Sequence, residues 1–250
     1  MRFLSHRRAF LLFALAAASL AMMLGRPVTA WAQVEVNTCG QSVSGRAVLT
    51  GDLDCTGFDG HAVIVEIGRL DLNGFTITGG NFYGVACFRS CKIVGPGTIT
   101  GSQRNGVTVW GKATIRGVAI TGNGQEGVEA RSVEIRDSTI TGNGGGIRAD
   151  RSVKVRDSVI TGNAGSGVVV GVLDYIGHGM FECRKARMSI GDSTTITGNG
   201  LGADCGVSWA CADLVSCPKA PRLRGAVTCD TSLVNGSALP GESWGICTLD

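Results

Sequence analysis

The sequence has too few histidines, and cysteines at the wrong spacing, for a common zinc site. It contains three histidines, and because His6 lies within residues 1–32, only His61 and His178 remain beyond that segment. None of the ten cysteines forms a Cys-x-x-Cys pair, which is the spacing of zinc knuckles. We therefore expect neither a metal nor a cofactor.

Long hydrophobic runs are missing everywhere except near the N-terminus. There, Arg7 and Arg8 precede an apolar run from Ala9 to Leu24, and Ala30-Trp31-Ala32 offers small residues for cleavage. Residues 1–32 are therefore predicted to be a signal peptide. Its paired arginine before a Phe-Leu step resembles a twin-arginine export signal, while an ordinary secretory signal stays open. No later segment reaches the roughly 20 apolar residues of a spanning helix, so we expect an exported protein, periplasmic or extracellular, without a membrane span.

An excess of charge of one sign is also absent. Four of the 23 lysines and arginines lie in residues 1–32, whereas all 20 acidic residues follow them, so residues 33–250 carry 19 basic and 20 acidic groups and a formal net charge of −1. Net charge therefore favours neither a nucleic-acid binder nor another polyanion binder.

A helical period of 3.6 is missing too, and a repeat of about 20 residues is present instead. The motif Ile-Thr-Gly-Asn begins at Ile120, Ile140, Ile160 and Ile196. The last interval is longer than the others and corresponds to one repeat plus an insertion. Each repeat also holds a Gly-Val or Gly-Ile step and a short run that alternates with period two, such as Val133-Glu134-Ile135.

Three short strands in each repeat predict a triangular coil, and stacked coils predict a parallel sheet on each side. We therefore expect an all-β fold, a single-stranded right-handed parallel β-helix of about six to seven coils. The expected organisation is an N-terminal cap at residues 33–59, the β-helix at residues 60–210 with an insertion loop at residues 171–187, and a cysteine-rich C-terminal cap at residues 211–250.

The Ile-Thr-Gly-Asn turns, the Gly-Val steps and the run Leu70-Asp71-Leu72-Asn73-Gly74 resemble the right-handed parallel β-helix repeat family, which is related in fold to the pectate lyases. The resemblance covers most of residues 60–210 and implies the fold. It implies no activity, because the fold carries many chemistries. The Asn-Thr-Asp and Asp-Asp motifs of polygalacturonases and the Asp-Pro-His-Glu motif of mannuronan epimerases are absent.

An even number of cysteines in an exported chain predicts disulfides, up to five of them, that pin the caps. Cys87 and Cys91 share interior columns with Val109 and Ala113, so they are either bonded to each other, which we favour, or two buried thiols. The candidates are Cys39, Cys55, Cys87, Cys91, Cys183, Cys205, Cys211, Cys217, Cys229 and Cys247.

Polar residues recur in rows from coil to coil. Asn123, Asn143, Asn163 and Asn199 share one turn position and are expected to form a structural ladder of amides. Arg116, Arg136 and Arg156 form an outward row, and we consider them candidate substrate-binding residues for an anionic sugar. Outward pairs of opposite charge are expected between Glu134 and Lys154 and between Glu129 and Arg148. Thr-x-Thr segments such as Thr139-Ile140-Thr141 resemble ice-binding arrays, although Ala119 and Val159 interrupt the rows.

The insertion at residues 171–187 is the clearest departure from the repeat. A loop that projects from regular coils can wall a cleft. Its candidate catalytic residues are Asp174, His178, Glu182 and Arg184, with Tyr175 as a candidate for substrate binding, because these types neutralise an acidic sugar and transfer protons. The alternative is a surface flap whose charged residues face water.

These observations favour a non-catalytic or carbohydrate-binding module of the envelope or extracellular space, expected to be a monomer with polysaccharide as its partner. One alternative is a lyase-like or hydrolase-like enzyme that acts on polysaccharide through the insertion loop. A remote alternative is an ice-binding surface.

Overall fold

The computed structural model describes residues 33–171, 173–177, 180–183, 186–191 and 193–200, followed by short strands at residues 214–216, 222–224, 227–229, 232–234 and 237–238. Residues 33–250 form a compact unit by themselves. The predicted signal peptide at residues 1–32 lies outside the described residues. In the described part no helix is long and apolar enough to span a membrane.

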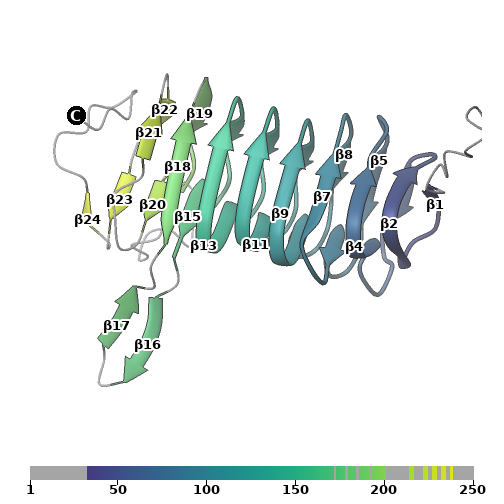
Figure 1. Ribbon diagram of the computed structural model, residues 1–250, viewed down its shortest axis with the longest axis horizontal. Coiled ribbons are helices and arrows are strands. Elements are labelled where there is room, and N and C mark those ends of the chain that lie inside the picture. Colours follow the sequence, from purple (N-terminus) through teal and green to yellow (C-terminus); the bar gives the residue numbers. More distant parts are fainter. Residues whose placement is uncertain are drawn as a thin grey trace, which may run out of the picture. The chain divides into compact units, whose positions relative to one another are not determined.

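The described chain is a parallel β-solenoid with about six turns between residues 60 and 200, as the repeat predicts (Figure 1). One sheet has 14 strands, and its long members pair in parallel with the strand one coil earlier and one coil later. Its strands are β1 (Val34–Val36), β2 (Gln41–Leu49), β4 (Val63–Asp71), β6 (Val85–Cys87), β7 (Cys91–Val94), β9 (Val107–Arg116), β11 (Glu126–Arg136), β13 (Gly145–Arg156), β15 (Val168–Val170), β18 (Arg187–Gly191), β20 (Leu214–Ser216), β21 (Arg222–Arg224), β23 (Ser232–Val234) and β24 (Ser237–Ala238).

A second sheet holds the Ile-Thr segments of the repeat. Ile120 pairs in register with Ile99 on one side and Ile140 on the other. Its strands are β3 (Leu53–Cys55), β5 (Thr76–Gly79), β8 (Thr98–Thr100), β10 (Ala119–Thr121), β12 (Thr139–Thr141), β14 (Val159–Thr161), β19 (Thr194–Thr197) and β22 (Val227–Cys229).

The larger sheet covers two sides of the solenoid, because its long strands turn a corner midway. Strands β4 and β9 each pair with both β6 and β7, and the register of β11 shifts between Ala130 and Ser132. We call the side with β6, β15 and the first halves of the long strands the first face. The side with β7, β18, β21 and the second halves is the second face, and the smaller sheet is the third face.

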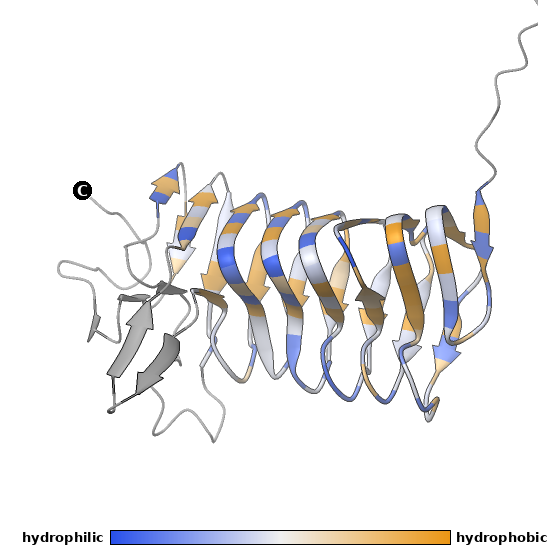
Figure 2. Cartoon of the chain, turned by 60° about the horizontal axis from the view of Figure 1, so that its bottom comes forward, coloured by the Kyte–Doolittle hydropathy of each residue, from blue (hydrophilic) through white to orange (hydrophobic). Residues whose placement is uncertain are grey.

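Columns of aliphatic side chains fill the interior, and hydrophobic residues alternate with hydrophilic ones along the strands (Figure 2). The column formed by Ile77, Ile99, Ile120, Ile140, Ile160 and Ile196 is fully buried. Each such side chain stabilises the fold by about 1.5–3 kcal/mol relative to an exposed one. The period-two alternation of the sequence therefore corresponds directly to this core.

The glycine of each Gly-Val step is required by the interior column beside it. A Cβ on Gly127 would lie 2.7 Å from Cγ2 of Ile140 and 3.0 Å from Nδ2 of Asn143. A Cβ on Gly106 would meet Ile120 and Asn123 in the same way, at 2.7 Å from each. The glycine thus makes room for the isoleucine and asparagine of the neighbouring coil.

The turn after each Ile-Thr segment carries a ladder of asparagine amides. Asn123 donates from Nδ2 to Oδ1 of Asn143 at 2.8 Å, and Asn163 donates to Asn199 at 2.8 Å. Gly142, which precedes Asn143, has a φ of 65°, a left-handed conformation that glycine adopts without strain. At the first rung Ser102 replaces asparagine, and its backbone N–H donates to Oδ1 of Asn123 at 3.1 Å.

Two disulfides lie in the N-terminal half of the described chain. Cys39 is bonded to Cys55, and Cys87 is bonded to Cys91, so the favoured interpretation of the second pair is confirmed. Cys229 is also disulfide-bonded. Cys205, Cys211, Cys217, Cys247 and the side chain of Cys183 lie outside the described residues.

The ends of the solenoid continue the coils. Within residues 33–59, β2 and β3 pair in parallel with β4 and β5, so this segment is wound as the first coil. Beyond residue 200, β20 and β21 extend the larger sheet and β22 extends the smaller one.

The insertion forms an antiparallel hairpin of β16 (Leu173–Gly177) and β17 (Met180–Cys183). The backbone of Asp174 pairs with that of Glu182, and Tyr175 pairs with Phe181. Two candidate catalytic residues of the insertion are thus direct cross-strand neighbours. The side chains of Asp174, Tyr175 and Glu182, and the whole of His178 and Arg184, lie outside the described residues.

Candidate functional site

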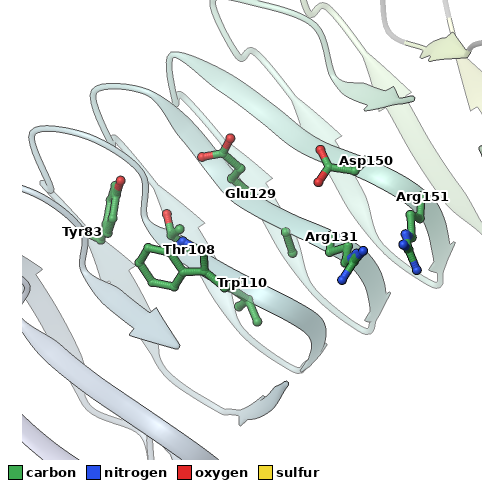
Figure 3. Close-up of a pocket in the computed structure, with 9 residues that line it drawn as sticks. Tyr83, Thr108, Trp110, Glu129, Arg131, Asp150 and Arg151 are labelled. Atoms are coloured by element: carbon green, nitrogen blue, oxygen red, sulfur yellow. The ribbon is translucent and has the colours of Figure 1, made fainter. Parts of the chain in front are cut away.

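A groove of about 660 Å³ lies on the first face and reaches the corner with the second face (Figure 3). Four successive coils contribute to it, through the segment before β6 and through β9, β11 and β13. Its lining residues are Tyr83, Thr108, Val109, Trp110, Glu129, Ala130, Arg131, Asp150 and Arg151.

Aromatic rings form one end of the groove. Trp110 is 50 % exposed, and its ring meets Tyr83 edge-on with ring centroids 6.3 Å apart. Phe88 stacks on Trp110 with ring centroids 5.1 Å apart. A half-exposed tryptophan braced by two rings is a rigid, flat apolar surface.

The row of rings continues beyond Tyr83. His61 stacks on Tyr83 with centroids 4.9 Å apart and planes 7° from parallel. Phe82 meets His61 at 5.7 Å, and the guanidinium of Arg104 lies 4.8 Å above the Phe82 ring. Burial lowers the pKa of His61, and its buried Nδ1 has no hydrogen-bond partner in the described part of the chain. The imidazole therefore serves there as a neutral packing surface.

A buried amide holds the first carboxylate of the groove. Asn105 is only 1 % exposed and donates from Nδ2 to Oε2 of Glu129 at 2.6 Å and to Oγ1 of Thr108 at 3.0 Å. Its Oδ1 accepts a hydrogen bond from the backbone N–H of Glu126. Because Asn105 is fixed at both ends of its amide, Glu129 is held in one orientation toward the groove.

The other charged groups of the groove are exposed and free to meet a ligand. Figure 3 shows Glu129 and Asp150 on neighbouring strands and Arg131 and Arg151 at the corner, and Asp150 lies two residues beyond Arg148, the register partner of Glu129. Within the described ranges, none of Arg131, Asp150 and Arg151 forms an ion pair. The groove therefore combines an apolar wall with both hydrogen-bond acceptors and donors.

The predicted arginine row lies on the second face. Arg136 pairs in register with Arg116 and Arg156, and Arg156 with Gly191, which pairs with Arg224. The register of β1, β2, β4, β7, β9, β11, β13, β18 and β21 puts three carboxylates on this face, Glu35, Asp71 and Glu134. It puts eleven cations there, Arg46, Arg69, Lys92, Lys112, Arg116, Arg136, Lys154, Arg156, Arg187, Arg222 and Arg224.

Some of these cations are paired within the protein. Glu134 accepts from Lys112 at 2.6 Å and lies 3.9 Å from Lys154, which confirms one expected pair. The hydrogen bond from Lys112 is the main reason why the pKa of Glu134 is lowered. Arg116 pairs with Asp137 at 3.1 Å, and Arg69 with Asp71 at 2.6 Å.

The other expected pair is confirmed as neighbours but not as an ion pair. Glu129 and Arg148 are neighbours in register, but Arg148 forms its ion pair with Glu126 at 3.6 Å. The reason is that Asn105, which stands one coil before Glu129, already holds the Glu129 carboxylate.

The third face carries the threonines. One column runs without a break through Thr78, Thr100, Thr121, Thr141, Thr161 and Thr197. The other is interrupted at Ala119 and Val159, as the sequence requires. The unbroken column is the observation on which the ice-binding alternative rests.

The groove was not predicted from the sequence. The insertion is the clearest departure from the repeat, and the candidate catalytic residues were therefore assigned to it. Tyr83 and Trp110 belong to successive coils, and only the coil register brings them together. The rarity of these residue types could have pointed to the groove, since Tyr83 is one of two tyrosines and Trp110 one of four tryptophans in the chain. In the described part of the chain, no group of three or more His, Cys, Asp or Glu residues is placed to hold a metal ion.

Comparison with known proteins agrees with this architecture. A protein-family model described as a right-handed beta helix region matches residues 61–184. No curated protein and no solved structure matched the chain.

Proposed function

Because the chain is a right-handed β-helix repeat protein, we propose that it is an exported protein that binds carbohydrate in the groove on its first face. The observation that carries the proposal is the half-exposed Trp110 ring, braced by Phe88 and Tyr83 and followed by polar groups. The C–H face of a sugar ring stacks on such an aromatic surface, while its hydroxyls need donors and acceptors close by. The charged side chains that line the groove supply both.

The length of the groove favours an oligosaccharide. Tyr83, Trp110, Glu129 and Asp150 come from four successive coils, and three coil spacings amount to about 14 Å. A single sugar ring would contact only part of this length. A glycan chain lying along the coils would meet the rings first and the charged groups next.

Export is supported by the cysteines and by the N-terminal pattern. The Cys39–Cys55 and Cys87–Cys91 disulfides belong in an oxidising compartment. The charged, then apolar, then small-residue pattern of residues 1–32 is what an export signal requires.

A polysaccharide-acting enzyme is the second candidate, and one observation favours it. Glu129 and Asp150 lie on neighbouring strands of the same groove (Figure 3). Most enzymes that hydrolyse a glycosidic bond use a pair of carboxyl groups as their catalytic residues. The insertion residues Asp174, His178, Glu182 and Arg184 remain candidates for the same role.

The test is a screen of the purified protein against neutral and acidic glycans by calorimetry. We expect a ligand to bind and Trp110→Ala to weaken it by about tenfold or more, as for other exposed aromatic anchors. Phe58→Ala removes an aromatic ring of comparable exposure at the N-terminal end and should leave the affinity unchanged. A protein that binds no glycan, or a Trp110→Ala variant that binds as tightly as the parent, would contradict the proposal.

The same samples separate the enzyme from the binding module. Release of reducing ends or of unsaturated products that disappears in the Glu129→Gln and Asp150→Asn variants would establish the enzyme. Glycan binding without any product would favour the non-catalytic binding module.

A further inference from the structure

We propose that the second face is a docking surface for a membrane that bears anionic phosphate headgroups. This surface is separate from the groove and independent of the function proposed for it. The starting observation is charge segregation, because the second face carries eleven cations and three carboxylates, although residues 33–250 together have a net charge of −1. Even with Asp137 and Asp157 at its edge, the face has a large positive excess.

Most of this charge is not neutralised by the protein itself. In the part of the chain that the structure describes, ion pairs on this face involve only Arg69, Lys112, Arg116 and Lys154. The other seven cations have none. They are Arg46, Lys92, Arg136, Arg156, Arg187, Arg222 and Arg224.

Two of the unpaired arginines are direct neighbours. Arg136 and Arg156 pair in register on adjacent strands, about 4.8 Å apart. Like charges directly opposite each other on a sheet are destabilising. Gly191 follows in the same row, and an added Cβ there would lie 3.9 Å from Cγ of Arg156 and 3.6 Å from Cβ of Arg224. Arg136 and Arg156 thus bring two guanidinium groups together without an ion pair in the described chain, which favours a counter-charge supplied from outside.

The form of the face favours a planar partner. Its cations stand in three columns that run across the parallel strands, from one coil to the next. A linear polymer would follow one column, whereas a flat anionic surface meets all three. No aromatic residue occurs at its described outward positions, and aromatic rings are what the groove offers to a glycan. Guanidinium groups bind phosphate through two parallel hydrogen bonds, which makes arginine suitable for headgroups.

The attraction expected from these cations is sufficient for peripheral docking. A lysine or arginine close to an anionic leaflet contributes about fivefold to the binding constant, and the seven unpaired cations act together. The interaction should weaken strongly as salt is added, because the Debye length shortens from about 10 Å at 0.1 M salt to about 3 Å at 1 M.

The test is sedimentation of the full-length protein with vesicles of pure phosphatidylcholine and with vesicles of phosphatidylcholine and phosphatidylglycerol in equal parts. Apolar binding through residues 1–32 is common to both vesicle types, so the ratio of the two partition coefficients reports the electrostatic part. Because residues 1–32 carry four arginines of their own, the share of the second face in this ratio is the share that the variants of that face remove. We expect a ratio of about tenfold or more at low salt, and a ratio near one at high salt.

Matched variants locate the effect. Arg136→Gln with Arg156→Gln should reduce the ratio by about twenty-five-fold, or to one if the parent ratio is smaller. Arg104→Gln with Arg148→Gln removes the same charge from outside the second face and should leave the ratio unchanged. Arg136→Lys with Arg156→Lys keeps the charge and should retain most of the binding.

Three outcomes would overturn the proposal. One is the absence of a preference for the anionic vesicles, and another is an equal loss in the Arg104/Arg148 control. The third is binding to soluble polyuronate that depends on Arg136 and Arg156 while the vesicles are ignored, which would assign the face to an acidic polysaccharide. Glycan binding in the groove is measured separately with Trp110→Ala, so the two proposals stand or fall independently.

Discussion

The side-chain amide of Asn143 donates a hydrogen bond from Nδ2 to Oδ1 of Asn163, at 3.0 Å, and its own Oδ1 accepts one from Nδ2 of Asn123 at 2.8 Å. The backbone N–H of Asn123 also donates to this oxygen, at 3.1 Å. Asn143 also donates from Nδ2 to the carbonyl of Thr141 at 3.2 Å, so it closes the turn of its own coil and joins it to both neighbouring coils.

The first prediction is that Asn143→Ala lowers the free energy of unfolding by about 2–4 kcal/mol, because it leaves the buried backbone N–H of Asn123 without its acceptor and removes the hydrogen bonds that the Asn143 amide donates. Denaturant unfolding followed by circular dichroism measures this. Asn143→Ser should be milder, since Ser102 occupies the equivalent position in an earlier coil and donates from Oγ to the carbonyl of Gly79 at 3.1 Å. Equal stability of the alanine variant and the parent would show that the ladder contributes nothing.

The second prediction concerns the glycine of the Gly-Val step. Gly127→Ala places a Cβ 2.7 Å from Ile140 and should cost about 1–3 kcal/mol through overpacking. Gly51→Ala is the matched control, because an added Cβ there meets nothing within 4 Å. Thermal unfolding of both variants measures the difference, and a Gly127→Ala protein as stable as Gly51→Ala would refute the explanation.

The third prediction concerns the Cys87–Cys91 disulfide, which closes the corner loop that presents Phe88 to Trp110. Val109 and Ala113 occupy the same positions one coil later, so Cys87→Val with Cys91→Ala keeps the interior filled and removes only the cross-link. For so short a loop the chain-entropy estimate is a loss of about 2 kcal/mol.

The same variant should loosen the loop locally. Arg89 is exposed between the two cysteines, and Ser90 accepts a hydrogen bond from the backbone N–H of Lys112 at 2.9 Å. We expect trypsin to cut after Arg89 faster in the variant than in the parent. Unchanged cleavage and unchanged stability together would show that Phe88 is held by its ring contacts alone.

The fourth prediction is a pH dependence of stability that comes from His61. Burial lowers its pKa below the ordinary value of 6.5, so the unfolded chain binds the proton more readily than the folded one. This contribution is fully present above pH 6.5 and is lost as the pH falls through the range between 6.5 and the lower folded pKa. An NMR titration of the imidazole should give a midpoint below 6.5.

His61→Phe is the control for that titration, because it keeps a ring against Tyr83 and removes the titrating group. Between pH 7 and 5 its stability should decline less steeply than that of the parent. A parent midpoint above 6.5, or identical slopes for the two proteins, would contradict the prediction.

The coil could be predicted well from the sequence because its features are local. In the Ile-Thr-Gly-Asn motif three residue types have a role that the sequence itself indicates. Isoleucine fills an interior column, glycine takes a left-handed turn conformation and asparagine bonds to the next coil. Cys87 and Cys91 could be placed inward for the same reason, because they occupy the columns of Val109 and Ala113. Glu129 shows the limit, because its partner Asn105 stands in a loop where no alternating pattern operates.

What the sequence alone determined is the architecture, because a short, fixed repeat with three alternating apolar segments buries its side chains only when triangular coils are stacked. What only the tertiary structure decided is which side chains meet. The register converts one coil of chain into one strand spacing, and so places Tyr83 beside Trp110 and Arg136 beside Arg156. Although the composition is balanced in charge, the aromatic groove lies on the first face and the basic surface on the second, because the first and second sides of each coil point in different directions.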